Sequence, residues 1–143
     1  MSLNSGLTTF SAVLSFAVEL EGESARFYEA AAKVADDLAE TFENYARRST
    51  KRQQRMVAVR QDNITEIILE PISGLNRADY QIAIVVPTDR QQAVALAIEL
   101  ETNAEKFYVE AEPKLNVTEP RRAFQKMAQE NEERIAELKA VLS

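Results

Sequence analysis

The sequence contains no cysteine and no histidine. Without cysteine, the chain cannot form disulfides, zinc fingers, iron–sulfur clusters or a thiol nucleophile. Without histidine, it lacks the commonest metal ligand and the usual general base of enzymes. These two absences exclude many catalytic classes before any motif is considered.

Glycine and proline are also scarce, with three and four residues respectively in a chain of 143. Because so few residues would break a helix, the composition favours long helices joined by few turns. A chain of this length forms one domain with a sizeable core. We therefore expect a single domain over residues 1–143.

Long apolar runs are absent as well. No stretch of about 18 apolar residues occurs, so no membrane-spanning segment is predicted. The N-terminus has no basic region followed by an apolar core and a cleavage site, which predicts a cytoplasmic protein. The net charge of −6 makes nonspecific nucleic-acid binding over the whole surface unfavourable.

Four stretches show apolar residues at alternating steps of three and four positions, the pattern of helices packed in a bundle. The first stretch runs from Leu7 to Ala35, the second begins near Leu38, the third follows Pro87 and the fourth begins near Thr118. The sequence therefore predicts an all-α protein with four helices.

Two of these helix starts carry local signals. Thr88 or Asp89 is the expected N-cap of the third helix. Thr118 is the expected N-cap of the fourth, with Pro120 in the first turn, where its missing N–H group is harmless.

The two halves of the chain repeat each other. AVELEGESARFYEAA (residues 17–31) matches AIELETNAEKFYVEA (residues 97–111) at an offset of 80 residues. FENYARRSTKR (residues 42–52) matches FQKMAQENEER (residues 124–134) at an offset of 82. Two matched pairs in the same order indicate a duplicated helical hairpin.

Residues 63–89 form an unusually long connection between the halves. A helix of about 25 residues is roughly 38 Å long, a distance that a dozen extended residues can cover. We therefore expect the connection to cross the bundle and start the third helix parallel to the second. Its first part could extend the second helix, and IAIVV (residues 82–86) could be a short extended strip. Its apolar residues are expected to pack on the bundle: Ile64, Ile67, Ile68, Leu69, Ile82, Ile84, Val85 and Val86.

A duplicated hairpin with a long crossover, carrying E-x-x-A/S-x-x-F-Y on its first and third helices, resembles the rubrerythrin branch of the ferritin-like superfamily. The resemblance covers the chain from about Leu7 to Leu142. It implies a ferritin-like four-helix bundle with up-down-down-up topology. In that family, each hairpin supplies one Glu from its first helix and a Glu-x-x-His from its second, and these six side chains hold two iron or manganese ions.

Carried over to this sequence, the resemblance retains only the first-helix carboxylates, Glu21 and Glu101. Both lie on the apolar face of their helix, where an unpaired carboxylate would be costly. The expected second-helix Glu positions hold Ser49 and Asn131, and the expected His positions hold Arg52 and Arg134. Four of the six ligands of a vestigial di-iron site are thus replaced, two of them by cations.

Charge balance suggests what the two arginines do. A di-iron(II) site with four carboxylates is neutral, and two Glu with two Arg are neutral as well. We expect Arg52 and Arg134 to replace the metal ions as partners of Glu21 and Glu101. The alternative is that these arginines, at the edge of the apolar stripe, keep only their stems in the core and extend outward. Ser49 and Asn131 would supply hydrogen bonds. Tyr28 and Tyr108 are expected to be core packing, and the alternative is that they are redox-active or contact the ligands of a metal site.

A different alignment with the family motif gives a candidate metal site made of carboxylates. Shifting the motif by one residue brings in Glu130 and Glu133, so a carboxylate site would consist of Glu21, Glu101, Glu130 and Glu133. Against this, Glu133 falls near the far side of a helix centred on Phe124, and the first half would offer Arg48 and Lys51. A single divalent ion near Glu21 and Glu101 is a further alternative.

The second helix also carries a basic strip. Arg47, Arg48, Lys51 and Arg55 fall on the face opposite Phe42 and are expected to be exposed. Such a strip is usually a solvated face balanced by neighbouring acids, and the alternative is an anion-binding surface. No aromatic residues interleave with it, so no base-stacking surface is indicated.

These features favour a non-catalytic protein without a cofactor, acting as a structural or interaction protein. The family resemblance further implies a homodimer or higher homo-oligomer. The alternative is a rubrerythrin-like oxidoreductase or iron-handling protein that holds iron or manganese through the remaining carboxylates. A third hypothesis is an anion-binding module that uses the basic strip.

Overall fold

The computed structural model of the protein describes residues 6–63 and 71–142. Within these residues the chain forms four α-helices and no β-strand; the helices are α1 (Phe10–Ala32), α2 (Ala39–Asp62), α3 (Arg90–Ala111) and α4 (Thr118–Ala140). Three short 3₁₀ turns lie between them: η1 (Asp36–Leu38), η2 (Arg77–Asp79) and η3 (Glu112–Lys114). The predicted all-α class is confirmed. None of the helices in the described part of the chain combines the length and apolarity needed to cross a bilayer.

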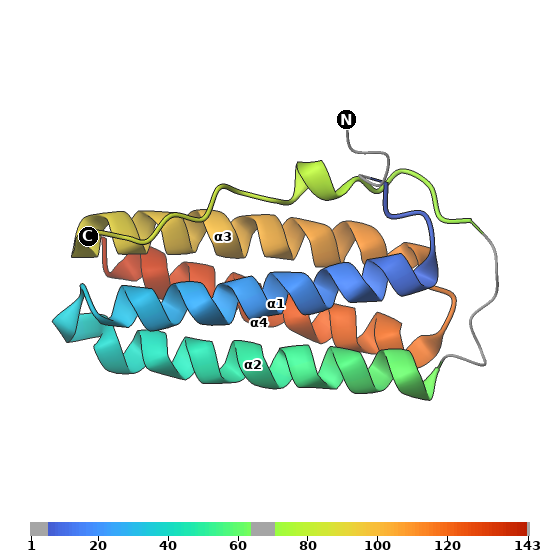
Figure 1. The fold of residues 1–143 in the computed structure, drawn as a ribbon, viewed down its shortest axis with the longest axis horizontal. Coiled ribbons are helices and arrows are strands. Elements are labelled where there is room, and N and C mark those ends of the chain that lie inside the picture. The colour runs from blue at the N-terminus through green and yellow to red at the C-terminus, as the bar shows by residue number, and fades with distance from the viewer. Residues whose placement is uncertain (1–5, 64–70, 143) are drawn as a thin grey trace.

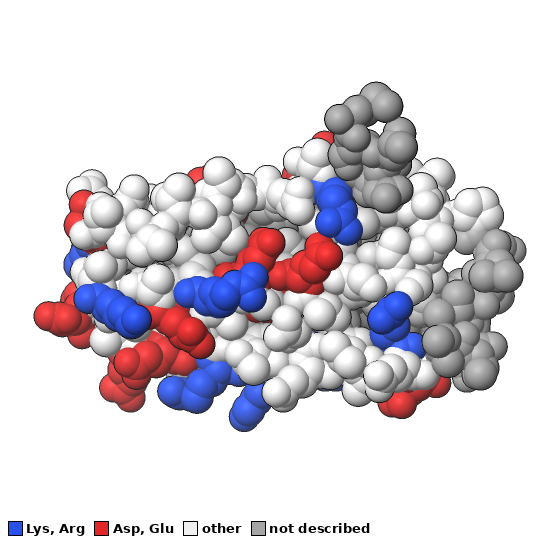
Figure 2. Space-filling view, viewed as in Figure 1, with Lys and Arg blue, Asp and Glu red and all other residues white. Residues whose placement is uncertain are grey.

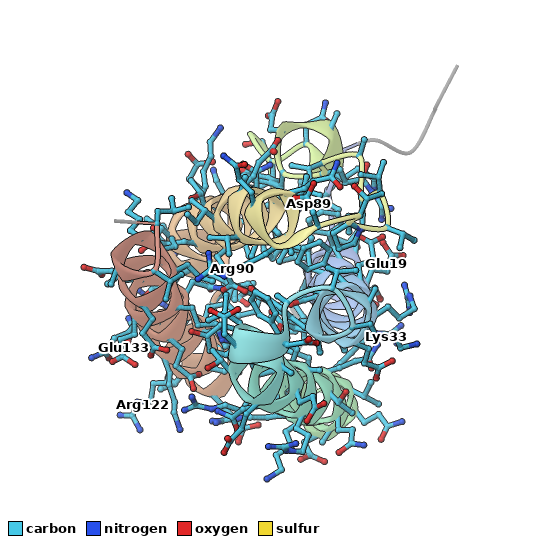
Figure 3. The ribbon with its side chains drawn as sticks, turned by 90° about the vertical axis from the view of Figure 1, so that its left-hand side faces the viewer. Glu19, Lys33, Asp89, Arg90, Arg122 and Glu133 are labelled. Atoms are coloured by element: carbon cyan, nitrogen blue, oxygen red, sulfur yellow. The ribbon has the colours of Figure 1, made fainter. Side chains whose placement is uncertain are left out.

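The helices form an up-down-down-up bundle (Figure 1). Helices α1 and α2 make one antiparallel hairpin, α3 and α4 make the other, and the crossover lets α3 start parallel to α2. Viewed along the bundle, α1 lies between α2 and α3, and α4 completes the ring (Figure 3). The predicted four-helix bundle with a long crossover is therefore present.

Capping residues define the starts of two helices. The side chain of Thr9 accepts a hydrogen bond from the Ala12 N–H at 3.0 Å, and Asp89 accepts one from Gln92 at 2.8 Å. The predicted Asp89 cap is confirmed, but the predicted Thr118 cap is wrong. Helix α4 already includes Thr118, and Val117 is its N-cap without a side-chain hydrogen bond. Val117 packs in the core, and the helix therefore starts at Thr118, one residue earlier than a Thr118 cap would give.

Two apolar clusters fill the bundle, one toward each end. One includes Phe16, Phe107 and Phe124, and the other includes Phe42 and Leu138. The buried polar residues of the four helices lie in neither cluster. The bundle therefore has a polar layer between two apolar cores.

The described part of the crossover is anchored by Leu75 and Tyr80, which are 5% and 2% exposed. The Leu7 N–H donates to the Leu75 carbonyl at 2.9 Å, and the Tyr80 ring packs against Phe16 and Phe107. These contacts hold the segment over α1 and α3 (Figure 1).

Beyond Tyr80 the crossover is less well packed. Ile82 is half-buried, but Ile84, Val85 and Val86 are 38%, 48% and 75% exposed. Ile84 still lines a small cavity between the crossover and helices α1 and α3, as the packing prediction requires. The prediction is wrong for Val85 and Val86, which are exposed. Leu75 and Tyr80 provide the anchor instead. Residues 82–86 have no regular secondary structure. The predictions for Ile64, Ile67, Ile68 and Leu69, and for an extension of the second helix, lie largely outside the described residues.

Candidate functional site

The six side chains selected from the sequence meet in the polar layer. Helices α1 and α3 contribute Glu21 and Glu101, and helices α2 and α4 contribute the other four: Ser49, Arg52, Asn131 and Arg134. None of the six is more than 7% exposed. Each falls on the inner face of its helix because it continues the apolar spacing of that helix. Their predicted inward position is confirmed.

Glu101 is surrounded by three donors. Arg134 Nη1 lies 3.2 Å from its Oε2 atom, and the Tyr28 hydroxyl donates to the same oxygen at 2.6 Å. The side-chain amide of Asn131 donates to Oε1 at 2.6 Å. The Arg134 guanidinium also lies 4.9 Å from the centre of the Tyr45 ring, close enough for a cation–π interaction.

Glu21 has fewer partners. Arg52 Nη1 lies 3.4 Å from Oε1, and the Tyr108 hydroxyl donates to Oε2 at 2.5 Å. Arg52 also donates through Nη2 to the Met127 carbonyl at 2.6 Å. On its outer side, Arg52 Nε lies 3.7 Å from the partly exposed Glu130. Both predicted Glu–Arg pairs are therefore present as buried ion pairs.

Further contacts join the two hairpins. Each tyrosine donates to the glutamate of the opposite hairpin. Each arginine likewise donates to a polar residue of the opposite hairpin, Arg134 to Ser49 at 3.1 Å and Arg52 to Asn131 at 3.5 Å. The site is one network rather than two independent ion pairs.

Burial and the glutamate charges keep the two tyrosines neutral. Burial first, and then the charge of Glu101, raises the pKa of Tyr28 well above its usual value of about 10. Burial and the charge of Glu21 do the same to the pKa of Tyr108. Both phenols therefore remain hydrogen-bond donors to the carboxylates at neutral pH.

The arginine of the second hairpin is held in its charged form. Burial by itself would lower the pKa of Arg134, but the charge of Glu101, assisted by Tyr28 and Glu21, raises it. Glu101 therefore faces a charged guanidinium, and the polar layer as a whole matches two acidic side chains with two basic ones.

The di-metal centre implied by the family resemblance does not fit these side chains. A guanidinium carries donors but no lone pair for a metal. Here Arg52 places a guanidinium nitrogen beside Glu21, and Arg134 places one beside Glu101. Within residues 6–63 and 71–142, no group of three or more His, Cys, Asp or Glu side chains is placed to hold a metal ion.

The alternative carboxylate site is not assembled either. Glu133 is exposed on the outer side of α4 (Figure 3). Glu130 is half-buried and lies near Arg48 and Arg52 rather than beside the two buried glutamates. Glu21, Glu101, Glu130 and Glu133 therefore do not converge, because successive positions on a helix point in different directions.

A small cavity of about 20 Å³ adjoins the network. Its polar lining includes Glu21, Ser24, Glu101 and Asn131, and the crossover residue Tyr80 contributes to its wall. This volume accommodates about one water molecule. It is too small for an organic substrate.

Sequence reasoning favoured core packing for the tyrosines over a polar role. Tyr28 and Tyr108 follow Glu21 and Glu101 by seven residues, two helical turns, so each tyrosine lies on the same face as the glutamate of its own helix. That spacing signalled an inward position, which is correct. It could not show that each hydroxyl reaches across the bundle to the glutamate of the other hairpin.

The basic strip is exposed as predicted. Arg47, Arg48, Lys51 and Arg55 all lie on the surface of α2. Arg48 lies 3.8 Å from Glu130, and the depression beside Lys51 is also lined by Glu29 and Glu43. On the face shown in Figure 2, basic and acidic side chains are interspersed along the lower part of the bundle. Acidic side chains therefore accompany Arg47, Arg48 and Lys51.

Comparisons of the chain with models of protein families, with curated protein sequences and with solved structures gave no match.

Proposed function

We propose that this protein is a ferritin-like bundle of the rubrerythrin type in which two Glu–Arg pairs stand where the family holds its metals. It would act as a cytoplasmic structural or interaction protein rather than as a metalloenzyme. The observation that carries the proposal is the placement of Arg52 and Arg134, whose Nη1 atoms lie 3.4 and 3.2 Å from Glu21 and Glu101.

Electrostatics supports this proposal. An uncompensated carboxylate in a protein core costs several kcal/mol. In metal-binding relatives, the ions supply the compensating positive charge, and here the guanidinium groups can supply it. A divalent ion added to this layer would meet two fixed cations, so binding would require an arginine to leave its partner.

The hydrogen bonds to the two glutamates also support a layer without metal. Tyr28 and Tyr108 donate to the oxygen atoms of Glu101 and Glu21, and Asn131 donates to Glu101. Carboxylate oxygens occupied by these donors have fewer lone pairs to offer a metal. The adjoining cavity of about 20 Å³ also leaves no room for a substrate.

The proposal is tested by metal analysis of protein purified without chelators, before and after anaerobic incubation with Fe(II) and with Mn(II). We expect metal close to zero in every sample. A content of about one or two ions per chain that is lost in Glu101→Ala would overturn the proposal, since carboxylates alone would then hold metal.

A designed variant provides the positive control. The combined changes Ser49→Glu, Arg52→His, Asn131→Glu and Arg134→His restore the six-ligand set of the family. We expect this variant to bind about two Fe(II) or Mn(II) ions where the natural sequence binds none. Binding by neither protein would show that the bundle lacks the family's geometry, which would contradict the ferritin-like part of the proposal.

A further inference from the structure

The crossover segment 82–86 has an open backbone. Among the described residues, no hydrogen bond joins the N–H or C=O groups of this segment to another part of the chain. Its side chains are Ile82, Ala83, Ile84, Val85 and Val86, and the last three are 38% to 75% exposed. Exposed β-branched residues with unpaired backbone groups make a ready template for pairing with another strand.

A groove of about 420 Å³ lies beside this segment. Helix α1 contributes the apolar side chains Phe27 and Ala30 to its wall, and Glu23 and Arg26 add one charge of each sign. The segment 82–87 forms the other side. In Figure 2, the surface over the left half of α3 and the crossover carries few charged side chains.

The other exposed large apolar residues in the described chain do not share these properties. Val57 and Val109 are 41% and 57% exposed, but they stand on helices, whose backbone groups are already hydrogen-bonded. Leu142 is 54% exposed just after α4, and its N–H donates to the Lys139 carbonyl. Single exposed valines are ordinary features of a protein surface. Segment 82–86 instead combines consecutive apolar side chains, open backbone groups and an adjacent groove.

We propose that segment 82–86 is a homodimer interface, in which two copies of the chain pair their segments antiparallel about a two-fold axis. With the axis at Ile84, Ile82 faces Val86 of the second copy and Ala83 faces Val85. Apolar side chains then meet apolar side chains throughout, so the segment is self-complementary, as a two-fold contact requires. Pro87, which has no N–H group, ends the ladder.

The charges of the groove also suit a second copy. Each chain brings one acid, Glu23, and one base, Arg26, to the groove. The lining of the groove therefore carries no net charge, so the grooves of two copies do not repel each other locally. A strongly acidic or basic partner would find no opposite net charge there.

The expected dimer is weak. Five paired residues span about 17 Å, so the contact falls at the small end of specific interfaces, below roughly 1,200 Å². We therefore expect a dissociation constant in the micromolar range. This inference rests on the proposed function, because it identifies the partner of an interaction protein as a second copy of the same chain.

Sedimentation velocity from about 1 µM to about 1 mM tests the interface, since this range spans weak complexes. We expect the natural sequence to shift from monomer to dimer. Val85→Lys and Val86→Lys should each raise the dissociation constant about tenfold or more, because they place a charge in the pairing segment. Val109→Lys, on an exposed helix surface, should leave it unchanged. Circular dichroism should show the same helix content in all variants.

Amide hydrogen exchange gives a main-chain readout. Alternate amides of residues 82–86 should become protected as protein concentration rises, and Val85→Lys should abolish this change. A monomer at about 1 mM, or equal weakening by Val85→Lys and Val109→Lys, would overturn the interface.

Metal analysis of the same samples separates the two proposals. A monomeric protein without metal would overturn the interface and leave the metal-free bundle intact. A dimer that takes up Fe(II) or Mn(II) would overturn the metal-free function and leave the interface intact.

Discussion

The two buried Glu–Arg pairs stand at repeated positions of the chain but differ in how fully they are enclosed. Arg134 is 2% exposed, and its guanidinium lies near the rings of Tyr45 and Tyr28. Arg52 is 7% exposed and borders the partly exposed Glu130. Glu101 accepts from three side chains, whereas Glu21 accepts from two.

The difference arises from substitutions between the repeats. Tyr45 and Met127 occupy equivalent positions, so a ring covers Arg134 while Arg52 meets a backbone carbonyl. Asn131 reaches Glu101, but the shorter side chain of Ser49 instead shares a hydrogen bond with Ser24 at 3.1 Å.

Neither arginine is fully paired. Among the described residues, Arg134 Nη2 and Arg52 Nε are buried without a hydrogen-bond partner, although Arg52 Nε is within ion-pair distance of Glu130. A repeated pair of charges can therefore have unequal strength, because the surrounding side chains decide how each charge is solvated.

The largest effect is expected from Arg134→Ala, which leaves Glu101 buried without its cation. The free energy of unfolding should fall by about 3–5 kcal/mol. Arg52→Ala should cost less, because Arg52 lies at the edge of the layer, where water can reach Glu21. Urea denaturation measures both losses.

The control for this comparison is Arg48→Ala, which removes a side chain that is 50% exposed and should change stability by no more than about 0.5 kcal/mol. Equal small losses in all three variants would place both arginines in solvent.

Removing both charges of a pair should lower the free energy of unfolding by much less than the sum of the losses in the two single variants. We expect the cycle of Glu101→Gln and Arg134→Met to give a coupling energy of about 2–3 kcal/mol, because neither single variant leaves the remaining charge compensated. The matching cycle of Glu21→Gln and Arg52→Met should give a smaller value. Denaturant unfolding of all four variants and both doubles measures these energies, and additive losses in both cycles would contradict direct pairing.

For the tyrosines, we expect the larger loss of stability at Glu21 rather than at Glu101, the reverse of the order expected for the arginines. Among the residues that the structure describes, Tyr108→Phe leaves Glu21 with Arg52 as its one remaining side-chain donor, whereas Tyr28→Phe leaves Glu101 with Arg134 and Asn131. Hydrogen bonds to charged groups contribute about 1.5–3 kcal/mol, so we expect Tyr108→Phe near the upper value and Tyr28→Phe near the lower. Thermal unfolding compares the two variants directly. A larger loss in Tyr28→Phe would show that enclosure, rather than the number of donors, sets the cost.

Alkaline pH should destabilise the protein gradually. Tyrosine in the unfolded chain ionises with a pKa of about 10, but Tyr28 and Tyr108 have raised pKa values in the folded protein. The unfolded state thus loses these protons first. The tyrosine contribution is fully present below about pH 10 and is lost as the pH rises toward the folded pKa values.

Each of these two tyrosines should lower the free energy of unfolding by roughly 1 kcal/mol for each pH unit above about 10. Urea unfolding between about pH 8 and pH 11 measures the slope, and tyrosinate absorbance reports ionisation. The slope should be shallower in the double variant Tyr28→Phe, Tyr108→Phe. An unchanged slope would show that these two phenols do not titrate on unfolding.

Several of these features could be predicted from the sequence alone. The spacing of three and four residues predicted the helices and the inward faces on which Glu21 and Asn131 lie. The need to balance buried charge predicted the pairing of glutamate with arginine. Both inferences use local periodicity or simple charge balance, which a single sequence contains.

The tertiary structure decided the rest. Tyr108 and Glu21 are 87 residues apart, and their hydrogen bond depends on how the two hairpins pack. Val117 starts α4 one residue early because it fits the core, and Tyr80 anchors the crossover so that Val85 and Val86 remain exposed. The sequence determined which side chains point inward and which charges need partners. Only the packing of helices distant in sequence decided which partners they meet, because those contacts depend on side-chain shape across the bundle rather than on local spacing.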